Sequence, residues 1–342
     1  MPAEPEDHPP ASSFCPSPLL LAGPSAVGKS DIALRLAELL GGEIVSADSM
    51  QVYRGMDIGT AKPSPADRAR VPHHLIDVVD LTEPFDAAQF VCLARLAVAD
   101  IQSRGRRPIL CGGTGLYFKA FLQGLGETPP TDAVLRAVIE ATPLPELLRE
   151  LAEHDPATYE RIDRQNPRRV IRAIEVIRLT GKPFSAQRSN WQSAPPDLQL
   201  PTCGTGLARS AADLQCRIEA RVDAMFRQGW VAETEQLLQR GLVQNRTAMQ
   251  ALGYRQIADH LRGECSLAQT IELVKIRTRQ YAKRQMTWFR RQLPLTWINL
   301  EPQSPIEAVA ATIACSQAAN DAVGTARVRL KAAPAKHDGN CN

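Results

Sequence analysis

The sequence predicts an α/β fold, a doubly wound parallel sheet that is interrupted by an inserted helical subdomain. Two observations predict the sheet: a short apolar run followed by a glycine loop and a helical pattern occurs at residues 18–40 and again at 107–122. The third observation is that this alternation stops after Pro129-Pro130. Residues 131–203 then show helical patterns rich in Ala, Leu and Arg with little strand signal, so we expect the insertion there.

The insertion divides the predicted core into two segments, 17–130 and 204–317, and the ends at 1–16 and 318–342 read as disordered tails. A composition of 44% hydrophobic and 23% charged residues with a net charge of +3 is ordinary for a soluble globular protein. The eight cysteines are scattered without a CxxC pair, which indicates reduced thiols in the cytoplasm. Because no run of eighteen apolar residues occurs, we expect no membrane span.

The first glycine loop matches the phosphate-loop pattern G-x-x-x-x-G-K-[ST] in full. Its backbone N–H groups and the positive end of the following helix favour an anion, so we expect a P-loop NTPase-like core that binds a diphosphate or polyphosphate. The lysine would neutralise phosphate charge, and the closing serine hydroxyl would hold a magnesium ion. A structural turn that binds nothing is the alternative. The residues of the loop are Gly23, Pro24, Ser25, Ala26, Val27, Gly28, Lys29 and Ser30.

Two more candidate sites follow strands of the predicted sheet. Asp48 comes after the strand-like run 43–47, at the carboxyl end where ligands of open parallel sheets bind. Capping of the next turn, or ordering of magnesium beside Ser30, is the alternative role for this carboxylate. The second glycine turn, 112–115, places the hydroxyl of Thr114 at the start of a helix, although a purely structural turn would have the same sequence.

Basic residues gather in two segments. In the insertion, Arg168 and Arg172 lie four residues apart on one helix face, which fits a solvated face as well as a binding surface. Residues 275–291 carry seven Lys or Arg, three aromatic residues and no acid. Such a helix can grip a phosphate backbone and stack on bases, and we favour this interpretation over a core helix whose cations reach solvent. Before it, the turn 250–255 offers an aromatic ring and a guanidinium.

Three classes of function fit these features. A small-molecule kinase would need an arginine-bearing lid and no basic aromatic helix. An ATP-switched nucleic-acid-binding protein would need an apolar strand that ends in a magnesium-binding acid, whereas the run 109–111 ends in glycine. A transferase that holds a diphosphate leaving group while a nucleic-acid base attacks would need a free carboxylate beside the loop, further cations and a broad basic face. The phosphate loop by itself predicts ATP.

Several motifs together resemble the tRNA dimethylallyltransferase family, also called tRNA isopentenyltransferases. They occur in the family's order between about residues 18 and 300, and the longest is far more specific than the phosphate loop. The motifs are Gly23–Ser30, Ser46–Pro63, Gly112–Tyr117, Gly253–Arg255 and Arg279–Gln285. The resemblance implies transfer of a dimethylallyl group from dimethylallyl diphosphate to the exocyclic amine of the adenine 3′ of the anticodon. The substrates would be tRNAs that read codons starting with U, bound through the anticodon stem-loop, with Mg²⁺ as cofactor. We also expect a monomer.

The resemblance also implies roles for single residues. Asp48 would be the general base, with Thr114 and Lys29 as the other catalytic residues. Besides the phosphate loop, Arg217, Arg221 and Arg255 would bind the diphosphate. The tRNA would contact the Asp48 stretch, the second glycine turn, the arginine row of the insertion, the turn 250–255 and the basic helix. The expected tRNA contacts are Asp48, Ser49, Met50, Gln51, Thr114, Arg168, Arg169, Val170, Ile171, Arg172, Gln250, Ala251, Leu252, Gly253, Tyr254, Arg255, Lys283, Arg284, Gln285, Trp288 and Arg290.

Overall fold

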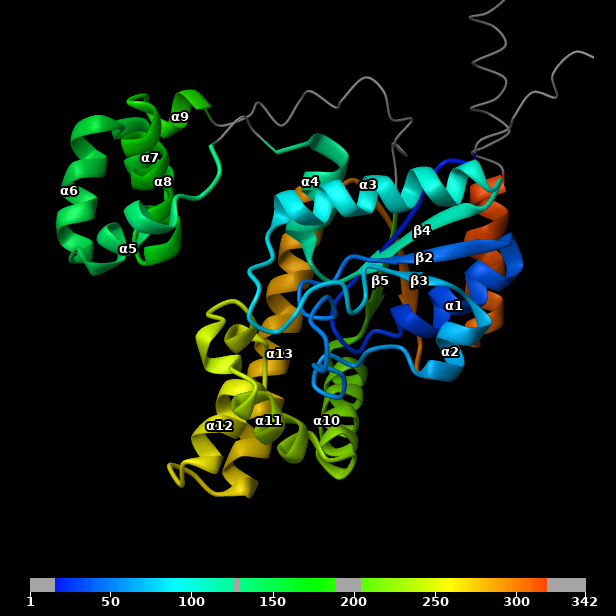
Figure 1. Cartoon of the computed structure of the whole chain (residues 1–342). Helices are drawn as coiled ribbons and strands as arrows, with labels where there is room; N and C mark the ends of the chain where they lie inside the picture. Colours follow the sequence, from blue (N-terminus) through cyan, green and yellow to red (C-terminus); the bar gives the residue numbers. More distant parts are fainter. Residues whose placement is uncertain (1–15, 126–128, 188–203, 319–342) are drawn as a thin grey trace, which may run out of the picture. The chain divides into compact units, whose positions relative to one another are not determined.

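The computed structural model describes residues 16–125, 129–187 and 204–318 (Figure 1). The chain divides into two compact units, one formed by 1–119 with 198–342 and the other by 120–197. The second unit overlaps the insertion expected at 131–203 but begins and ends earlier. The two expected tails fall outside the described residues, apart from Pro16 and Ala318.

Within the described residues, the first unit is built on a six-stranded sheet in the order β3-β2-β4-β1-β5-β6. Every adjacent pair of these strands is parallel. The predicted parallel α/β sheet is therefore confirmed. The central β1 is buried along its whole length, as expected for a strand covered on both faces. The strands are β1 (Leu19–Ala22), β2 (Gly42–Ser46), β3 (His73–His74), β4 (Arg107–Gly112), β5 (Gly204–Arg209) and β6 (Leu295–Leu300).

Helices cover both faces of this sheet (Figure 1). One face carries α1 and a helix at 306–318, which join β1 and β4 in one hydrophobic cluster. The opposite face carries α3, which packs on β2 and β4. The helices of this unit are α1 (Lys29–Leu40), α2 (Pro65–Arg70), α3 (Ala87–Ser103), α4 (Gly115–Gln123, which runs into the second unit), α10 (Ala211–Arg227), α11 (Trp230–Gln239), η1 (Leu242–Gln244), η2 (Ala248–Gln250), α12 (Tyr254–Leu261) and α13 (Leu267–Gln292).

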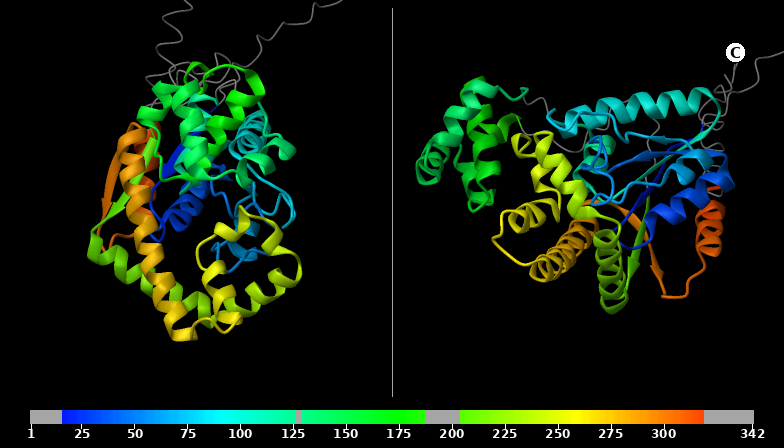
Figure 2. Two further views of the ribbon diagram at one scale, coloured as in Figure 1. Left: turned by 90° about the vertical axis from the view of Figure 1, so that its left-hand side faces the viewer. Right: turned by 60° about the horizontal axis from the view of Figure 1, so that its bottom comes forward.

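The helices α10 to α13 form a layer of their own beside the sheet. α10 and α12 both pack against α13, and α12 also packs against α11. Figure 2 shows α13, in orange, leading from α12 back to the sheet. Its start is fixed by a capping box, in which the Ser266 hydroxyl accepts from the amide of Gln269 and the Gln269 side chain accepts from the amide of Ser266. None of the helices in the described part of the chain is long and apolar enough to span a bilayer.

The second unit is a small helical bundle with its own core. Amphipathic helices bury one face each, and α8 supplies much of the interior through Val170, Ile174 and Ile177, which meet Leu147 and Leu151 of α6. The unit therefore has a hydrophobic core independent of the sheet. Its helices are α5 (Ala133–Ala141), α6 (Leu144–His154), α7 (Pro156–Arg161), α8 (Pro167–Thr180) and α9 (Phe184–Gln187).

Candidate active site

A pocket of about 410 Å³ opens in the first unit at the carboxyl ends of β1, β2 and β4. Ligands of open α/β sheets bind at this edge. The phosphate loop, the segment 48–51 and the second glycine turn line the pocket from the sheet side, and α10 and α13 line it from the helical layer. The structure thus brings together three motifs that are far apart in the sequence.

Three cationic side chains hold the carbonyl groups of the phosphate loop. Lys29 Nζ donates to Pro24 O at 2.7 Å, Arg217 Nε to Ala26 O at 2.9 Å, and Arg209 Nε to Val27 O at 2.9 Å. Gly28, at φ 104°, provides the left-handed turn into α1. Since the carbonyl groups of the loop are engaged by these side chains and three cations surround it, the loop favours an anionic ligand. Arg209 was not predicted, because nothing in the sequence marks the end of a strand as reaching the loop.

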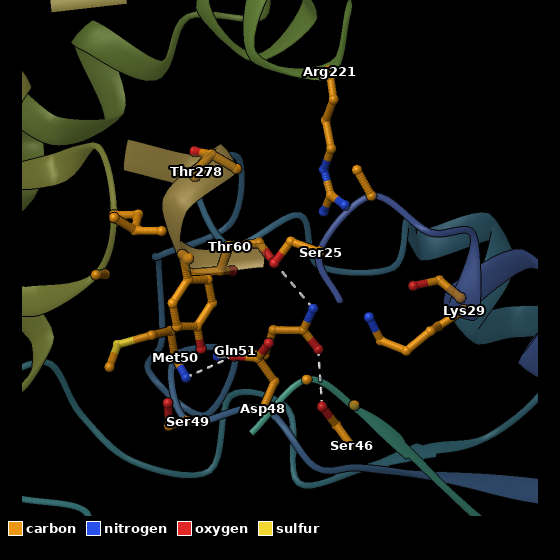
Figure 3. Close-up of a pocket in the computed structure, with 18 of the residues that line it drawn as sticks. Ser25, Lys29, Ser46, Asp48, Ser49, Met50, Gln51, Thr60, Arg221 and Thr278 are labelled. Atoms are coloured by element: carbon orange, nitrogen blue, oxygen red, sulfur yellow. Dashed lines mark hydrogen bonds between the residues drawn. The ribbon is translucent and has the colours of Figure 1, made fainter. Parts of the chain in front are cut away.

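The amine of Lys29 points into the pocket in Figure 3, and the guanidinium of Arg221 on α10 points toward the same space. Burial lowers the pKa of Lys29 to about 8, with a smaller contribution of the same sign from Arg221. An anion bound here would favour the charged amine, because it replaces the lost solvation. The structure therefore places Lys29 and Arg221 in the pocket of the predicted diphosphate site, while Arg217 contacts the phosphate loop at Ala26 O and is not among the lining residues.

Arg255 lies elsewhere. It stands in the first turn of α12 and lines a second pocket, of about 540 Å³, together with Arg277, Arg284 and Asp259. Arg255 is not among the residues that line the first pocket. Its expected role at the diphosphate is therefore corrected, because Arg255 lines the second pocket and not the pocket that contains the phosphate loop.

Asp48 sits directly beyond the end of β2 with its carboxylate in the pocket (Figure 3). Its Oδ1 accepts from the amides of Met50 at 2.9 Å and Gln51 at 3.3 Å. Among the described residues, no hydrogen bond reaches Oδ2. One oxygen is thus fixed by the backbone, and the other is available to a ligand. Asp48 combines the capping role and the free carboxylate that the sequence offered as alternatives.

Thr114 contacts the two residues that flank Asp48 in the chain, Ala47 and Ser49. Its hydroxyl accepts from the amide of Ser49 at 3.1 Å and lies 3.4 Å from the Ser49 hydroxyl, to which it can donate. The Thr114 amide donates to Ala47 O at 3.2 Å. Among the described residues, no hydrogen bond joins Thr114 to the carboxylate itself, and Thr114 is not among the residues that line the pocket. Thr114 holds the chain on both sides of Asp48, and its expected catalytic and RNA-binding roles stay predictions.

Gln51 ties the segment after Asp48 to the loop 57–62. Its Oε1 accepts from the Ser46 hydroxyl at 2.9 Å, and its Nε2 donates to Thr60 O and Ala61 O, both at 3.2 Å (Figure 3). All polar atoms of the side chain are therefore engaged within the protein. Gln51 shapes the pocket wall, although it was expected to contact the tRNA. Ser49 and Met50 line the pocket beside it.

Glu233 on α11 was not predicted. Its Oε2 accepts from the amides of Asp57 at 3.0 Å and Ile58 at 2.6 Å, and its Oε1 accepts from the amide of Gly59 at 3.2 Å and the hydroxyl of Tyr254 at 2.7 Å. A carboxylate that accepts from three consecutive amides fixes that loop firmly. No local sequence signal links residues 176 positions apart, so only the folded structure could show this contact.

Tyr254 and Gly253 belong to the same buried cluster. Tyr254 is fully buried, and burial together with Glu233 raises the pKa of its phenol. A side chain on Gly253 would overlap the ring of Trp230. The buried Tyr254 cannot offer its side chain to an RNA, so this expected contact is corrected, whereas the expected contact of Gly253 stays a prediction. Gln250, Ala251 and Leu252, by contrast, line both pockets.

On the basic helix α13, some of the predicted contact residues face solvent and others face the protein. Lys283, Arg284 and Arg290 are exposed, whereas Gln285 is 7% exposed and bonds to the phosphate loop. Trp288 is half-buried over Gly115. The three cations fit the expected nucleic-acid face. The expected RNA contact of Gln285 is corrected, because the helix turns this side chain toward the protein, whereas that of the half-buried Trp288 stays a prediction.

In the second unit, the arginine row is also divided. Arg168 and Arg169 are exposed at the start of α8, but Val170 and Ile171 belong to the core of the unit. Arg172 donates to the buried Glu175 at 2.8 Å and to Pro129 O at 2.6 Å. Val170 and Ile171 are therefore corrected as RNA contacts, since a run of consecutive helical residues cannot all face one ligand.

Magnesium fits this pocket only in combination with a phosphate. The described residues hold no group of three or more His, Cys, Asp or Glu side chains that could bind a metal. Mg²⁺ often takes one or two protein ligands and completes its shell with waters and phosphate oxygens. Ser30 is exposed at the start of α1 and lines the pocket, so its hydroxyl suits that arrangement.

Comparison with known sequences places these features in one family. The family model described as IPP transferase matches residues 51–292. A protein named tRNA dimethylallyltransferase 2 from Geotalea uraniireducens is 47% identical over 285 residues, which cover 82% of this chain and 91% of that protein. A tRNA dimethylallyltransferase from Geobacter sulfurreducens is 45% identical over 285 residues, with the same shares of 82% and 91%.

Solved structures give the same result. The full-length tRNA isopentenylpyrophosphate transferase from Bacillus halodurans superposes with a TM-score of 0.65 at 37% identity, covering 90% of this chain and 99% of that one. A eukaryotic dimethylallyltransferase, described as acting on tRNA, gives a TM-score of 0.73 at 25% identity, covering 94% and 81%. Since the family model spans more than half of the sequence and the named relatives align over most of it, this chain belongs to the IPP transferase family, as its motifs indicate.

Proposed function

We propose that this protein transfers the dimethylallyl group of dimethylallyl diphosphate to the exocyclic amine of the adenine 3′ of the anticodon, in tRNAs that read codons starting with U. The products are N6-(dimethylallyl)adenosine and diphosphate. One observation carries the proposal: a single pocket contains both a cation-rimmed phosphate loop and a carboxylate with one free oxygen, Asp48 Oδ2. These are the two groups that a transfer from a diphosphate to a weakly basic amine requires.

The phosphate side of the pocket stabilises the leaving group. As the bond from the allylic carbon to the diphosphate oxygen breaks, the electron pair stays on the diphosphate. The loop amides, Lys29, Arg217 and Arg221 stabilise that charge, each charge-assisted hydrogen bond contributing on the order of 1.5–3 kcal/mol. Lys29 uses one N–H on Pro24 O and has two more for the ligand. Magnesium held at Ser30 would supply further charge neutralisation when bound with the diphosphate.

The carboxylate side accepts the proton. The adenine amine attacks the allylic carbon, a new C–N bond forms, and the amine proton passes to Asp48 Oδ2. A positioned general base of this kind contributes roughly 10²- to 10⁴-fold. The target base must leave its stack to reach the pocket, which costs a few kcal/mol. Gln250, Ala251 and Leu252, which line the pocket from the segment before α12, are suited to hold it.

The RNA would bind outside the pocket through cations. Lys283, Arg284 and Arg290 on α13 provide a sequence-independent grip on the phosphate backbone. Arg168 and Arg169 are exposed in the second unit and would add to it. The monomeric state and the cytoplasmic location expected from the sequence stay predictions.

The decisive test is incubation of the protein with unmodified tRNA, labelled dimethylallyl diphosphate and Mg²⁺, followed by nuclease digestion and a search for prenylated adenosine. We expect label in one nucleoside next to the anticodon, and far slower labelling with Asp48→Asn. Hydrolysis of ATP without any carbon group on the RNA would overturn the proposal and favour the kinase or ATP-switch alternatives.

A further inference from the structure

The side chain of Gln285 connects three parts of the active site. On α13, its Oε1 accepts from the amide of Ser25 at 2.9 Å and from the Ser25 hydroxyl at 3.2 Å. Its Nε2 donates to Gly113 O at 2.8 Å. One carboxamide therefore bridges the phosphate loop, the second glycine turn and the helix that carries the exposed cations.

The position of this carboxamide suits only a side chain that can both donate and accept a hydrogen bond. The Ser25 amide needs an acceptor, and the Gly113 carbonyl needs a donor, so the orientation of the amide is determined by its partners. The site is also tight: a β-carbon on Gly113 would lie 2.4 Å from Nε2. Gln285 is 7% exposed and lines the pocket beside Ser25 and Gly113, so its loss would leave two nearly buried backbone groups without their protein partner.

The bridge sets the geometry on both sides of the reaction centre. Ser25 lies in the loop that faces the diphosphate, and Gly113 precedes Thr114, which holds the chain next to Asp48. Further contacts keep α13 against this turn, since Trp288 packs over Gly115 and Phe289 packs edge-on to Phe118 at 6.0 Å. Among the described residues, this carboxamide makes the hydrogen bonds between α13 and the phosphate loop.

We infer that Gln285 is a positioning residue, which holds the Ser25 amide and the second glycine turn at the spacing that diphosphate binding and transfer need. The inference rests on the proposed function for its link to catalysis. Its effect on diphosphate binding can be measured without any transfer. Gln285 itself touches neither the reacting atoms nor the RNA in this account.

The first experiment measures the Kd of inorganic diphosphate with Mg²⁺ by calorimetry, for the wild-type protein and for Gln285→Met. Methionine fills a similar volume but makes neither hydrogen bond. We expect Kd to rise about tenfold, because buried backbone groups lose their partners. The Kd for an anticodon stem-loop RNA should stay within about twofold, since the exposed cations are untouched. Gln280→Met, at an exposed position of the same helix, is the matched control and should leave both constants unchanged.

The second variant, Gln285→Glu, separates positioning from mere packing. The carboxylate form cannot donate to Gly113 O and places negative charge beside the loop, whereas the protonated form can make both hydrogen bonds. Burial raises the pKa of such a carboxyl group, so protonation should occur on going from pH 8 to pH 6. Relative to wild type at each pH, diphosphate affinity should therefore recover at pH 6 for Gln285→Glu but not for Gln285→Met.

Gly113→Ala provides an independent check that leaves Gln285 in place. The added methyl group displaces the carboxamide, so we expect a similar loss of diphosphate affinity. Unchanged diphosphate affinity in Gln285→Met and Gly113→Ala, or no pH-dependent recovery in Gln285→Glu, would overturn the inference. If wild-type protein binds diphosphate but transfers no prenyl group, the proposed function fails while this result still decides the role of Gln285.

Discussion

The phosphate loop and the basic helix α13 face the same pocket but place their functional groups in different ways. The loop presents backbone amides, whose directions follow from the glycine spacing and the strand–loop–helix order. On α13, neighbouring side chains diverge: Lys283 and Arg284 are exposed, and Gln285 is buried against the loop. A motif that acts through its backbone predicts geometry, whereas the composition of a helix predicts only that some of its residues form a surface.

The largest effect is expected at Asp48, the predicted general base, which follows β2 and is positioned through the backbone as the phosphate loop is. Asp48→Asn can still accept from the amides of Met50 and Gln51 but cannot take up a proton. We expect kcat at saturating RNA to fall by roughly 10²- to 10⁴-fold. The Kd for tRNA should stay within about twofold. A kcat within tenfold of wild type would mean that another group removes the proton.

Substitution of Lys29 tests the role of the phosphate loop, and we expect a smaller effect than that of Asp48→Asn. Lys29→Ala removes one charge-assisted contact, so diphosphate affinity should fall by about 10- to 100-fold. The pH dependence has a definite sign. Because burial lowers the pKa of Lys29 to about 8, the free amine loses its proton above that pH, and diphosphate binding must then restore it. Wild-type affinity should therefore weaken as the pH rises through about 8, and this trend should be absent from Lys29→Ala. A pH trend that persists in the variant would assign the titration to another group.

On the RNA side, the double variant Lys283→Ala, Arg284→Ala should leave the chemistry alone. We expect weaker tRNA binding and a slope of log K against log salt that is shallower by about 1.4–1.8, since two phosphate contacts are lost. The kcat at saturating RNA should not change. Arg262→Ala removes an exposed cation that is paired with Asp259 and Glu264, and it serves as the control. An unaltered salt slope in the double variant would show that this face of α13 does not contact the RNA.

The same contrast explains which parts of the structure could be predicted from the sequence. The sheet and the phosphate loop were predictable, because apolar runs and glycine spacing act locally. Asp48 was predictable for the same reason, since it directly follows a strand. Val170 and Ile171 are expected at the RNA together with their neighbouring arginines, but the helical repeat turns them into the core of their unit.

Arg255 and Glu233 show the limit of local reasoning. Arg255, in the first turn of α12, lines the second pocket and is not among the residues that line the first. Glu233 fixes the loop 57–59 from a helix that is distant in the sequence. Both outcomes depend on how α11 and α12 pack, and neither the residue types nor their spacing carries that information.

The smallest expected effects concern two arginines of the second unit, whose substitutions should change different properties. Arg169 is exposed, whereas Arg172 shares the buried carboxylate of Glu175 with Arg136, at 2.8 and 3.1 Å. Arg169→Ala should reduce the salt slope of RNA binding by about 0.7–0.9 and leave stability unchanged, if one phosphate contact is lost. Arg172→Ala should instead lower the free energy of unfolding of this unit by roughly 1–3 kcal/mol, because a buried carboxylate loses a partner. Urea unfolding and salt-dependent binding of both variants would measure the contrast. Equal effects of the two substitutions on RNA binding would show that exposure does not decide which arginine of α8 contacts the RNA.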